Sequence, residues 1–272
     1  MIVIAMTREI GSHGSDVAAG LVTQLGLSII NSEIVASNVA GRLGVEEGTV
    51  KRYLEGSASI FERWQVDTKK LSRYTSEEIL TLAQQGNVLI RGWGAAALFR
   101  DIPAVISVRV CTPMALRVRL MMERLGVQDA DAIRQEIERF DAAHAKTMRA
   151  SFNVERDDAF LYHMVLNTAR MPIDACVKAI CQLAQDPRFQ GDTTIGPALA
   201  DKLLETKVSA ALSDEIGIGD APAGVTVSAN NGTVTLMAVS SSGNLRAKAE
   251  KVASRVPGVC AIDNRITSVP GR

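Results

Sequence analysis

The stretch that decides the fold lies at the start of the chain, where an apolar segment runs into a turn rich in glycine and serine. It reads Ile2-Val3-Ile4-Ala5-Met6-Thr7-Arg8-Glu9-Ile10-Gly11-Ser12-His13-Gly14-Ser15-Asp16-Val17. A buried strand, such a turn and a helix leave several backbone N–H groups unbonded at the helix N-terminus, where they bind phosphate. The sequence therefore predicts a nucleotide site, with five phosphate-binding residues: Gly11, Ser12, His13, Gly14 and Ser15.

The turn differs from the usual phosphate-binding loop, in which a lysine stands just before the helix and a Ser or Thr follows it. Gly14 occupies about the place of that lysine, and Ser15 is the residue nearest to the usual magnesium-binding hydroxyl. We predict no metal ligand from the protein itself.

Composition limits the classes of partner. The 272 residues are 47% hydrophobic and 22% charged, and 30 Lys and Arg balance 30 Asp and Glu. Because the formal net charge is zero, nothing attracts the whole chain to nucleic acid or to an anionic membrane, and we predict no nucleic-acid partner. The four cysteines form no C-x-x-C pair, which favours reduced thiols in a cytoplasmic protein. No signal peptide or transmembrane segment is predicted.

Alternating strand and helix patterns follow the first turn and predict an α/β fold with a parallel sheet. Further strands are expected at 27–30, 87–90, 104–110 and 162–168, and helices at 16–25, 95–99, 114–125, 130–149 and 172–183. Polar residues stand at the carboxyl ends of two of these strands, where ligands bind in open α/β sheets. Asn31, Glu33 and Arg91 are therefore predicted to bind substrate.

Two helical regions allow more than one interpretation. Residues 33–85 are either a substrate-holding cap or plain structural helices. The helices at 114–125 and 130–149 carry many charged side chains, which either clamp phosphoryl oxygens or form a solvated face. These side chains are Arg117, Arg119, Arg124, Arg134, Arg139, Asp141, His144, Lys146 and Arg149.

Taken together and in this order, several stretches over residues 2–184 resemble the cytidylate-kinase-like family of P-loop proteins. They are Arg8 to Ser12, Asn87 to Ala95, Arg117 with Arg124, Phe140-Asp141, and Tyr162 with Val165 to Thr168. The resemblance implies a nucleoside-monophosphate-kinase fold with a helical insertion and a lid of arginine-bearing helices. It also implies phosphoryl transfer from ATP, with Mg²⁺, to a nucleoside monophosphate such as CMP.

The resemblance also implies roles for single residues. Arg8, Arg117, Arg124 and Arg149 become candidate catalytic residues that neutralise phosphate charge, while Asp141 would orient a lid arginine. The backbone N–H groups of the first turn would hold phosphate.

Four residues depart from the family's pattern. His13 interrupts a run that commonly reads Gly-Ser-Gly-Gly, Asn31 replaces an aspartate, and Trp93 follows Gly92 where an arginine is usual. His144 replaces the arginine of a lid Asp-x-x-Arg motif. These changes remove charges that phosphoryl transfer could use. An inactive nucleotide-binding sensor or scaffold is therefore the alternative to a kinase.

A second domain is predicted after a polar linker at 187–194, so that the first domain covers 1–186 and the second 195–272. An amphipathic helix at 198–212 precedes two alternating strands around Asn231-Gly232, the strongest short hairpin signal, and a helix and a strand follow. This α-β-β-α-β order and Val256-Pro257-Gly258-Val259 resemble a BON domain, which implies a protein or phospholipid partner. Six basic residues could contact anionic groups or merely aid solubility: Lys202, Lys207, Arg246, Lys248, Lys251 and Arg255.

Overall fold

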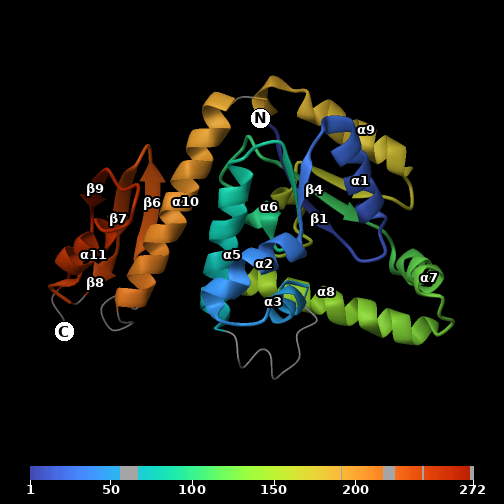
Figure 1. Cartoon of the computed structure of the whole chain (residues 1–272), viewed down its shortest axis with the longest axis horizontal. Coiled ribbons are helices and arrows are strands. Elements are labelled where there is room, and N and C mark those ends of the chain that lie inside the picture. The colour runs from blue at the N-terminus through green and yellow to red at the C-terminus, as the bar shows by residue number, and fades with distance from the viewer. Residues whose placement is uncertain (56–66, 191, 217–223, 241, 270–272) are drawn as a thin grey trace. The chain divides into compact units, whose positions relative to one another are not determined.

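The computed structural model describes residues 1–55, 67–190, 192–216, 224–240 and 242–269 (Figure 1). These residues belong to two compact units, Met1–Ile195 and Gly196–Arg272. In the described part of the chain, none of the helices combines the length and the apolar character needed to cross a bilayer. All four cysteines are free thiols, and Cys260 is exposed whereas Cys176 and Cys181 are buried.

The first unit is built on a parallel sheet of five strands in the order β2-β3-β1-β4-β5. The strands are β1 (Val3–Arg8), β2 (Ser28–Ile30), β3 (Val88–Arg91), β4 (Ile106–Cys111) and β5 (Met164–Asn167). Central strand β1 is fully buried from Val3 to Met6, as expected for a parallel sheet covered on both faces. The predicted α/β fold is confirmed, and each strand was expected to within one or two residues.

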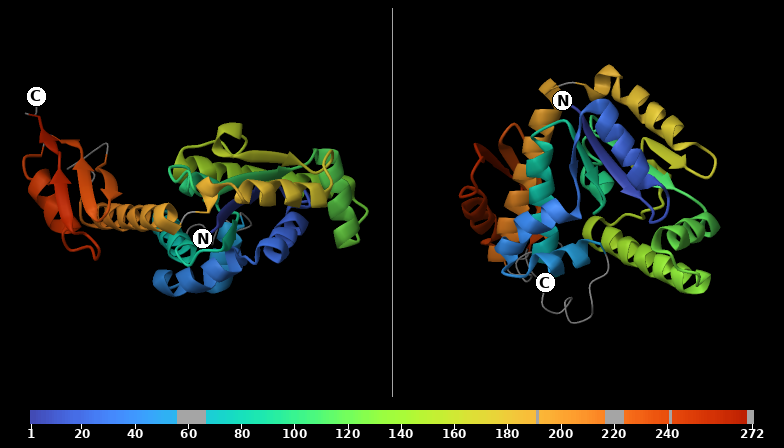
Figure 2. Two further views of the ribbon diagram at one scale, coloured as in Figure 1. Left: turned by 90° about the horizontal axis from the view of Figure 1, so that it is seen from above. Right: turned by 45° about the vertical axis from the view of Figure 1, so that its right-hand side comes forward.

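Helices lie on both faces of this sheet (Figure 1; Figure 2). They are α1 (Gly14–Leu25), α2 (Ser32–Leu43), α3 (Glu47–Leu54), α5 (Thr68–Ala83), α6 (Ala95–Leu98), α7 (Met114–Leu125), α8 (Ala130–Phe152) and α9 (Ile173–Ala184), with short 3₁₀ turns η1 (Ala159–Leu161) and η2 (Pro187–Phe189). Helix α5 packs against β3 and α6 against β1, while α1 and α9 pack together.

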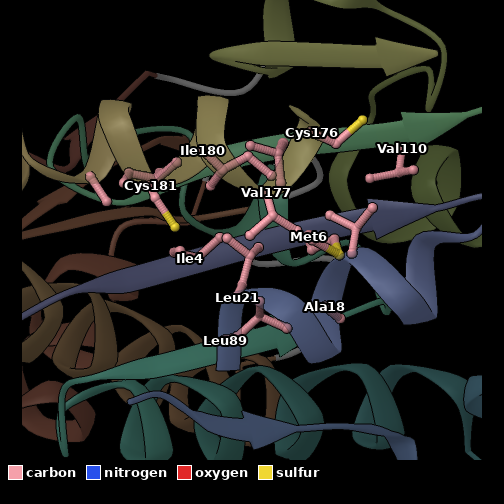
Figure 3. Close-up of a cluster of buried hydrophobic side chains, with 14 of the residues drawn as sticks. Ile4, Met6, Ala18, Leu21, Leu89, Val110, Cys176, Val177, Ile180 and Cys181 are labelled. Atoms are coloured by element: carbon pink, nitrogen blue, oxygen red, sulfur yellow. The ribbon is translucent and has the colours of Figure 1, made fainter. Parts of the chain in front are cut away.

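The core between α1, α9 and the sheet fixes the position of the first turn. Figure 3 shows Leu21 of α1 and Val177 of α9 beside Ile4 and Met6 of β1, and all four are buried. A Cβ added at Gly20 would lie 2.7 Å from Val177 Cγ2, so this glycine allows the two helices to approach closely. The strand before the turn and the helix after it are thus held by one apolar cluster.

The predicted helical region between the second and third strands contains α2, α3 and α5. Asn31 caps α2 and Asp67 caps α5, each accepting hydrogen bonds from two backbone N–H groups. Gly44 ends α2 in the left-handed conformation, whereas Gly41 and Gly48 lie inside helices. Residues 56–66, including Trp64, lie outside the described residues.

The second unit has the predicted α-β-β-α-β order. Most of α10 (Asp192–Glu215) belongs to it, followed by β6 (Thr226–Asn230), β7 (Thr233–Met237), β8 (Val239–Ser240), α11 (Leu245–Ala253), β9 (Ala261–Asn264) and β10 (Thr267–Ser268). Strand β7 pairs antiparallel with β6 and parallel with β9, and a separate pair joins β8 to β10. The hairpin turn is tied to α10, because the Asp201 carboxylate accepts hydrogen bonds from the N–H groups of Asn231, at 2.9 Å, and Gly232, at 3.3 Å.

Helical structure extends into the segment 187–194 that was predicted as a linker. It contains η2, whose first turn is capped by Asp186 and opened by Pro187, and the beginning of α10. Helix α10 therefore begins six residues before the predicted start at 198, with Pro197 inside it.

Candidate functional site

A cavity of about 260 Å³ lies at the carboxyl ends of β1, β2 and β3, the edge of an open parallel sheet where ligands bind. Helices α2, α3 and α5 contribute apolar walls, and α7 and α8 contribute charged and aromatic side chains. The lining residues are Arg8, Ile10, Ile30, Asn31, Ser32, Val35, Leu54, Glu55, Ile79, Ile90, Arg91, Gly92, Trp93, Arg124, Phe140 and His144. The cavity thus combines an apolar wall with a cationic one.

Three arginines form the cationic wall. Arg8 ends β1, Arg91 ends β3 and Arg124 lies in the last turn of α7. Within the described residues none of the three is in an ion pair. Burial, reinforced by repulsion from Arg91 and Arg124, lowers the pKa of Arg8 to about 10. Guanidinium groups that repel one another around a cavity are stabilised when an anion lies between them, and the geometry of phosphate matches their paired donors.

Ser12 has a structural role in the first turn, where hydrogen bonds tie it to neighbouring elements. The Ser12 hydroxyl donates to the carbonyl oxygen of Glu9 at 2.7 Å, and the Thr168 hydroxyl donates to the carbonyl oxygen of Ser12 at 2.8 Å. Gly11 and His13 both adopt positive φ angles, 76° and 56°, which favour glycine. The side chain of Ser12 is therefore turned into the protein, and its backbone shapes the loop.

Backbone donors of this turn remain available. No hydrogen bond within the described residues occupies the N–H groups of Gly11, His13, Gly14 or Ser15. A Cβ added at Gly14 would lie 2.6 Å from Arg8 Cβ, which is too close for two carbon atoms. Only glycine therefore allows the first residue of α1 to approach Arg8 so closely. The His13 Nδ1 pairs with Asp16 at 2.8 Å on the outside of the turn. The turn has the free amides that phosphate binding requires.

Of the three predicted substrate-binding residues, two line the cavity and one does not. Asn31 lines the cavity, but its Oδ1 accepts from the N–H groups of Glu33 at 3.0 Å and Ile34 at 3.2 Å and so caps α2. The Glu33 side chain is exposed and pairs with Lys51, and it does not line the cavity. Arg91 lies in the wall, as the strand-end argument predicts.

Sequence reasoning missed a closed ring of six ion-paired side chains next to the first turn. Arg109 contacts Glu9 at 2.7 Å and Asp157 at 2.8 Å. Arg156 contacts Asp157 at 3.1 Å and Asp141 at 3.0 Å. Three acids and three arginines alternate around the ring: Glu9, Arg109, Asp157, Arg156, Asp141 and Arg117.

Arg117 completes the ring and is buried in it. Its guanidinium donates to both Asp141 oxygens, at 2.7 and 3.0 Å, and to the carbonyl oxygen of Ile10 at 2.8 Å. Although burial opposes ionisation, hydrogen bonds from Arg117 and Arg156 hold the pKa of Asp141 below its ordinary value. The predicted lid residues Arg117 and Asp141 therefore join α7, α8 and the first turn to one another, and neither lines the cavity.

Arg149 lies apart from these residues. It is exposed near the end of α8 and pairs with Glu155 at 2.6 Å, and it is absent from the cavity lining. Of the four arginines given catalytic roles by resemblance, Arg8 and Arg124 are thus the two at the cavity.

Trp93 and His144, two of the departures from the family pattern, both line the cavity. Trp93 has a positive φ of 45°, and its ring meets Phe152 edge to face with centroids 5.4 Å apart. His144 packs against Phe140, with centroids 4.5 Å apart. Burial, with Arg156 and Arg8, lowers the pKa of His144 to about 4.

The residues of the site suit a metal that arrives with a nucleotide. Among the described residues, no group of three or more His, Cys, Asp or Glu side chains could hold a metal ion. Mg²⁺ commonly retains waters and uses substrate phosphates together with one or two protein ligands. Ser15, exposed in the first turn of α1, offers a hydroxyl beside the free amides.

The fold and the first turn define a P-loop-type α/β protein with a nucleotide-kinase-like sheet. Comparison with known families is more specific: residues 3–170 match the cytidylate kinase-like family, and residues 200–270 match the BON domain. The chain belongs to the cytidylate kinase-like family and carries a C-terminal BON domain. Both resemblances drawn from the sequence are confirmed.

Individual relatives agree with this assignment. A cytidylate kinase of Pyrobaculum aerophilum is 23% identical over 178 residues, which cover 65% of this chain and 90% of the relative. A cytidylate kinase of Ignicoccus hospitalis is 26% identical over 184 residues, which cover 66% of this chain and 97% of the relative. A solved structure of an uncharacterized protein from Eubacterium ventriosum shares the fold, with a TM-score of 0.54 and 18% sequence identity. The match covers 68% of this chain and 99% of that protein.

Proposed function

We propose that the first unit transfers a phosphoryl group from ATP to a nucleoside monophosphate of the CMP type. The observation that carries the proposal is the cavity wall of Arg8, Arg91 and Arg124, none of which is in an ion pair among the described residues, although the Glu55 carboxylate also lines the cavity. This wall lies beside a turn whose amides are free, so two phosphate-binding elements flank one edge of the sheet. Family membership supports the same reaction.

In this proposal the protein acts by positioning and charge. The acceptor phosphate oxygen attacks the γ-phosphorus, the bond to the bridging oxygen breaks, and ADP leaves. The arginine wall holds the acceptor phosphate, and the amides of Gly11, Gly14 and Ser15 hold the donor phosphates. Mg²⁺ bound with ATP supplies further charge neutralisation. Asp141 acts indirectly, because its pairs with Arg117 fix α7 and hence the position of Arg124.

The alternative is a nucleotide-binding sensor or scaffold that acts through the BON domain without transferring phosphate. Two observations favour it: Arg117 is held in the buried ring and Arg149 by Glu155. Fewer cations than the resemblance implies then remain to stabilise the transition state.

Measuring ADP production by the full chain separates the two. The protein is incubated with ATP and Mg²⁺ and with CMP, UMP or AMP, and binding of each nucleotide is titrated in parallel. A kinase produces ADP only when a monophosphate is present. Binding without ADP supports the sensor, and the absence of binding refutes both.

We further propose that the second unit binds a protein or a phospholipid. Lys202 and Arg255 pair with Glu205 and Glu215, at 2.8 and 3.4 Å, whereas Arg246 and Lys251 are exposed on α11. Cosedimentation of the full chain with vesicles containing an anionic phospholipid tests the lipid partner. No sedimentation above that with neutral vesicles would leave a protein as the partner class.

A further inference from the structure

His144 is held at the cavity with one ring nitrogen that has no partner. It follows Phe140 by one turn of α8 and packs against that ring, which holds the imidazole at the cavity wall. Its Nε2 is buried, and within the described part of the chain it makes no hydrogen bond. Buried polar atoms nearly always have a partner, so such an exception calls for an explanation.

The charges around the ring keep it neutral. Burial lowers the pKa of His144, Arg156 and Arg8 lower it further, and Asp141 acts in the opposite direction. With a pKa of about 4, the imidazole is uncharged near pH 7 and carries one N–H. It therefore offers a hydrogen-bond donor next to Arg8 without adding another positive charge.

We propose that His144 donates a ring N–H to the phosphate of the bound nucleoside monophosphate. The inference rests on the proposed function and adds a residue that determines the affinity for its substrate. His144 lines the same cavity as the three wall arginines, Arg8, Arg91 and Arg124, so its ring faces the space in which they would hold an anion. The last torsion of a histidine is broad and roughly two-fold, so a rotation of the ring suffices to present a nitrogen.

Two variants of the full chain test the contact. His144→Phe keeps an aromatic ring against Phe140 but removes both nitrogens, and His144→Gln restores an uncharged N–H donor. Calorimetric titration at pH 7 with CMP and with 2′-deoxy-CMP measures the affinity of each variant. We expect His144→Phe to weaken both nucleotides by about tenfold or more. His144→Gln should remain within about threefold of the parent, as expected for a restored donor.

Several results would contradict the inference. Unchanged affinity in His144→Phe refutes it, and equal losses in the Phe and Gln variants indicate packing alone. A loss seen with CMP but absent with 2′-deoxy-CMP assigns the contact to a ribose hydroxyl instead. If Arg91→Gln loses affinity while His144→Phe does not, the proposed function survives and this inference fails. If the parent protein binds neither nucleotide, both fail.

Discussion

Replacing Asp141 with asparagine should destabilise the first unit by about 3 kcal/mol, the lower end of the cost of breaking a buried ion pair. The side chain of Arg117 is 4% exposed and that of Arg156 is 11% exposed, so neither reaches water when the carboxylate is lost. Asparagine keeps the shape and one acceptor oxygen but not the charge. For a unit of this size the change corresponds to a fall in Tm of about 6–12 °C.

Urea denaturation followed by circular dichroism measures this cost. The matched control is Glu155→Gln, an acid-to-amide change in the exposed pair with Arg149, where no measurable loss is expected. Because the folded pKa of Asp141 is lowered, its contribution is complete above its ordinary pKa and is lost as the pH falls through the lowered value. The difference in the free energy of unfolding between the parent and Asp141→Asn should therefore disappear in acid. Equal losses in the two variants at pH 7 would refute the ring as a buried electrostatic unit.

Three further predictions follow from single contacts. Gly14→Ala should weaken nucleotide binding by displacing Arg8, whereas Gly41→Ala, with open space in α2, should not; titration with ATP and CMP checks both. The pKa of His144 is about 4 in the folded protein and about 6.5 in the unfolded chain. The free energy of unfolding should therefore fall by up to about 3 kcal/mol as the pH drops from the higher to the lower value. Urea denaturation at several pH values should show that His144→Gln lacks this pH-dependent loss of stability. Asp201→Ala should cost the second unit about 1–2 kcal/mol in thermal unfolding, because two backbone donors of the Asn231-Gly232 turn lose their acceptor.

The sheet was predictable because its signals are local. Each strand is an apolar run bounded by turn residues, and the turn after β1 shows its glycines directly. The strand pattern also placed Arg91 at a strand end, but its position beside Arg8 follows from the pairing of β1 with β3, which the structure shows. The two-residue strands β8 and β10 are too short to leave a pattern.

The ion-pair ring was not predictable from local patterns. Its members are joined by packing, and the pair of Arg109 with Glu9 spans 100 positions. One signal was present in the sequence: Arg109 is the one charged residue in the mostly apolar strand β4, and a charge in a buried strand requires an opposite charge. The strand pattern does not say which acid supplies it. The resemblance implied a phosphate-binding role for Arg117, whereas in the structure its donors are used by Asp141 and by the carbonyl oxygen of Ile10.

We propose above that Arg8, Arg91 and Arg124, which form no ion pair within the described part of the chain, bind the phosphate of a nucleoside monophosphate. Titration of the full chain with CMP tests it most directly, with Arg91→Gln as the variant and Arg134→Gln, exposed on α8, as the charge-matched control. We expect saturable binding that Arg91→Gln weakens by about tenfold or more, as expected for a charged hydrogen bond, and that Arg134→Gln leaves unchanged. Equal affinity in all three proteins, or no binding by any, would contradict it.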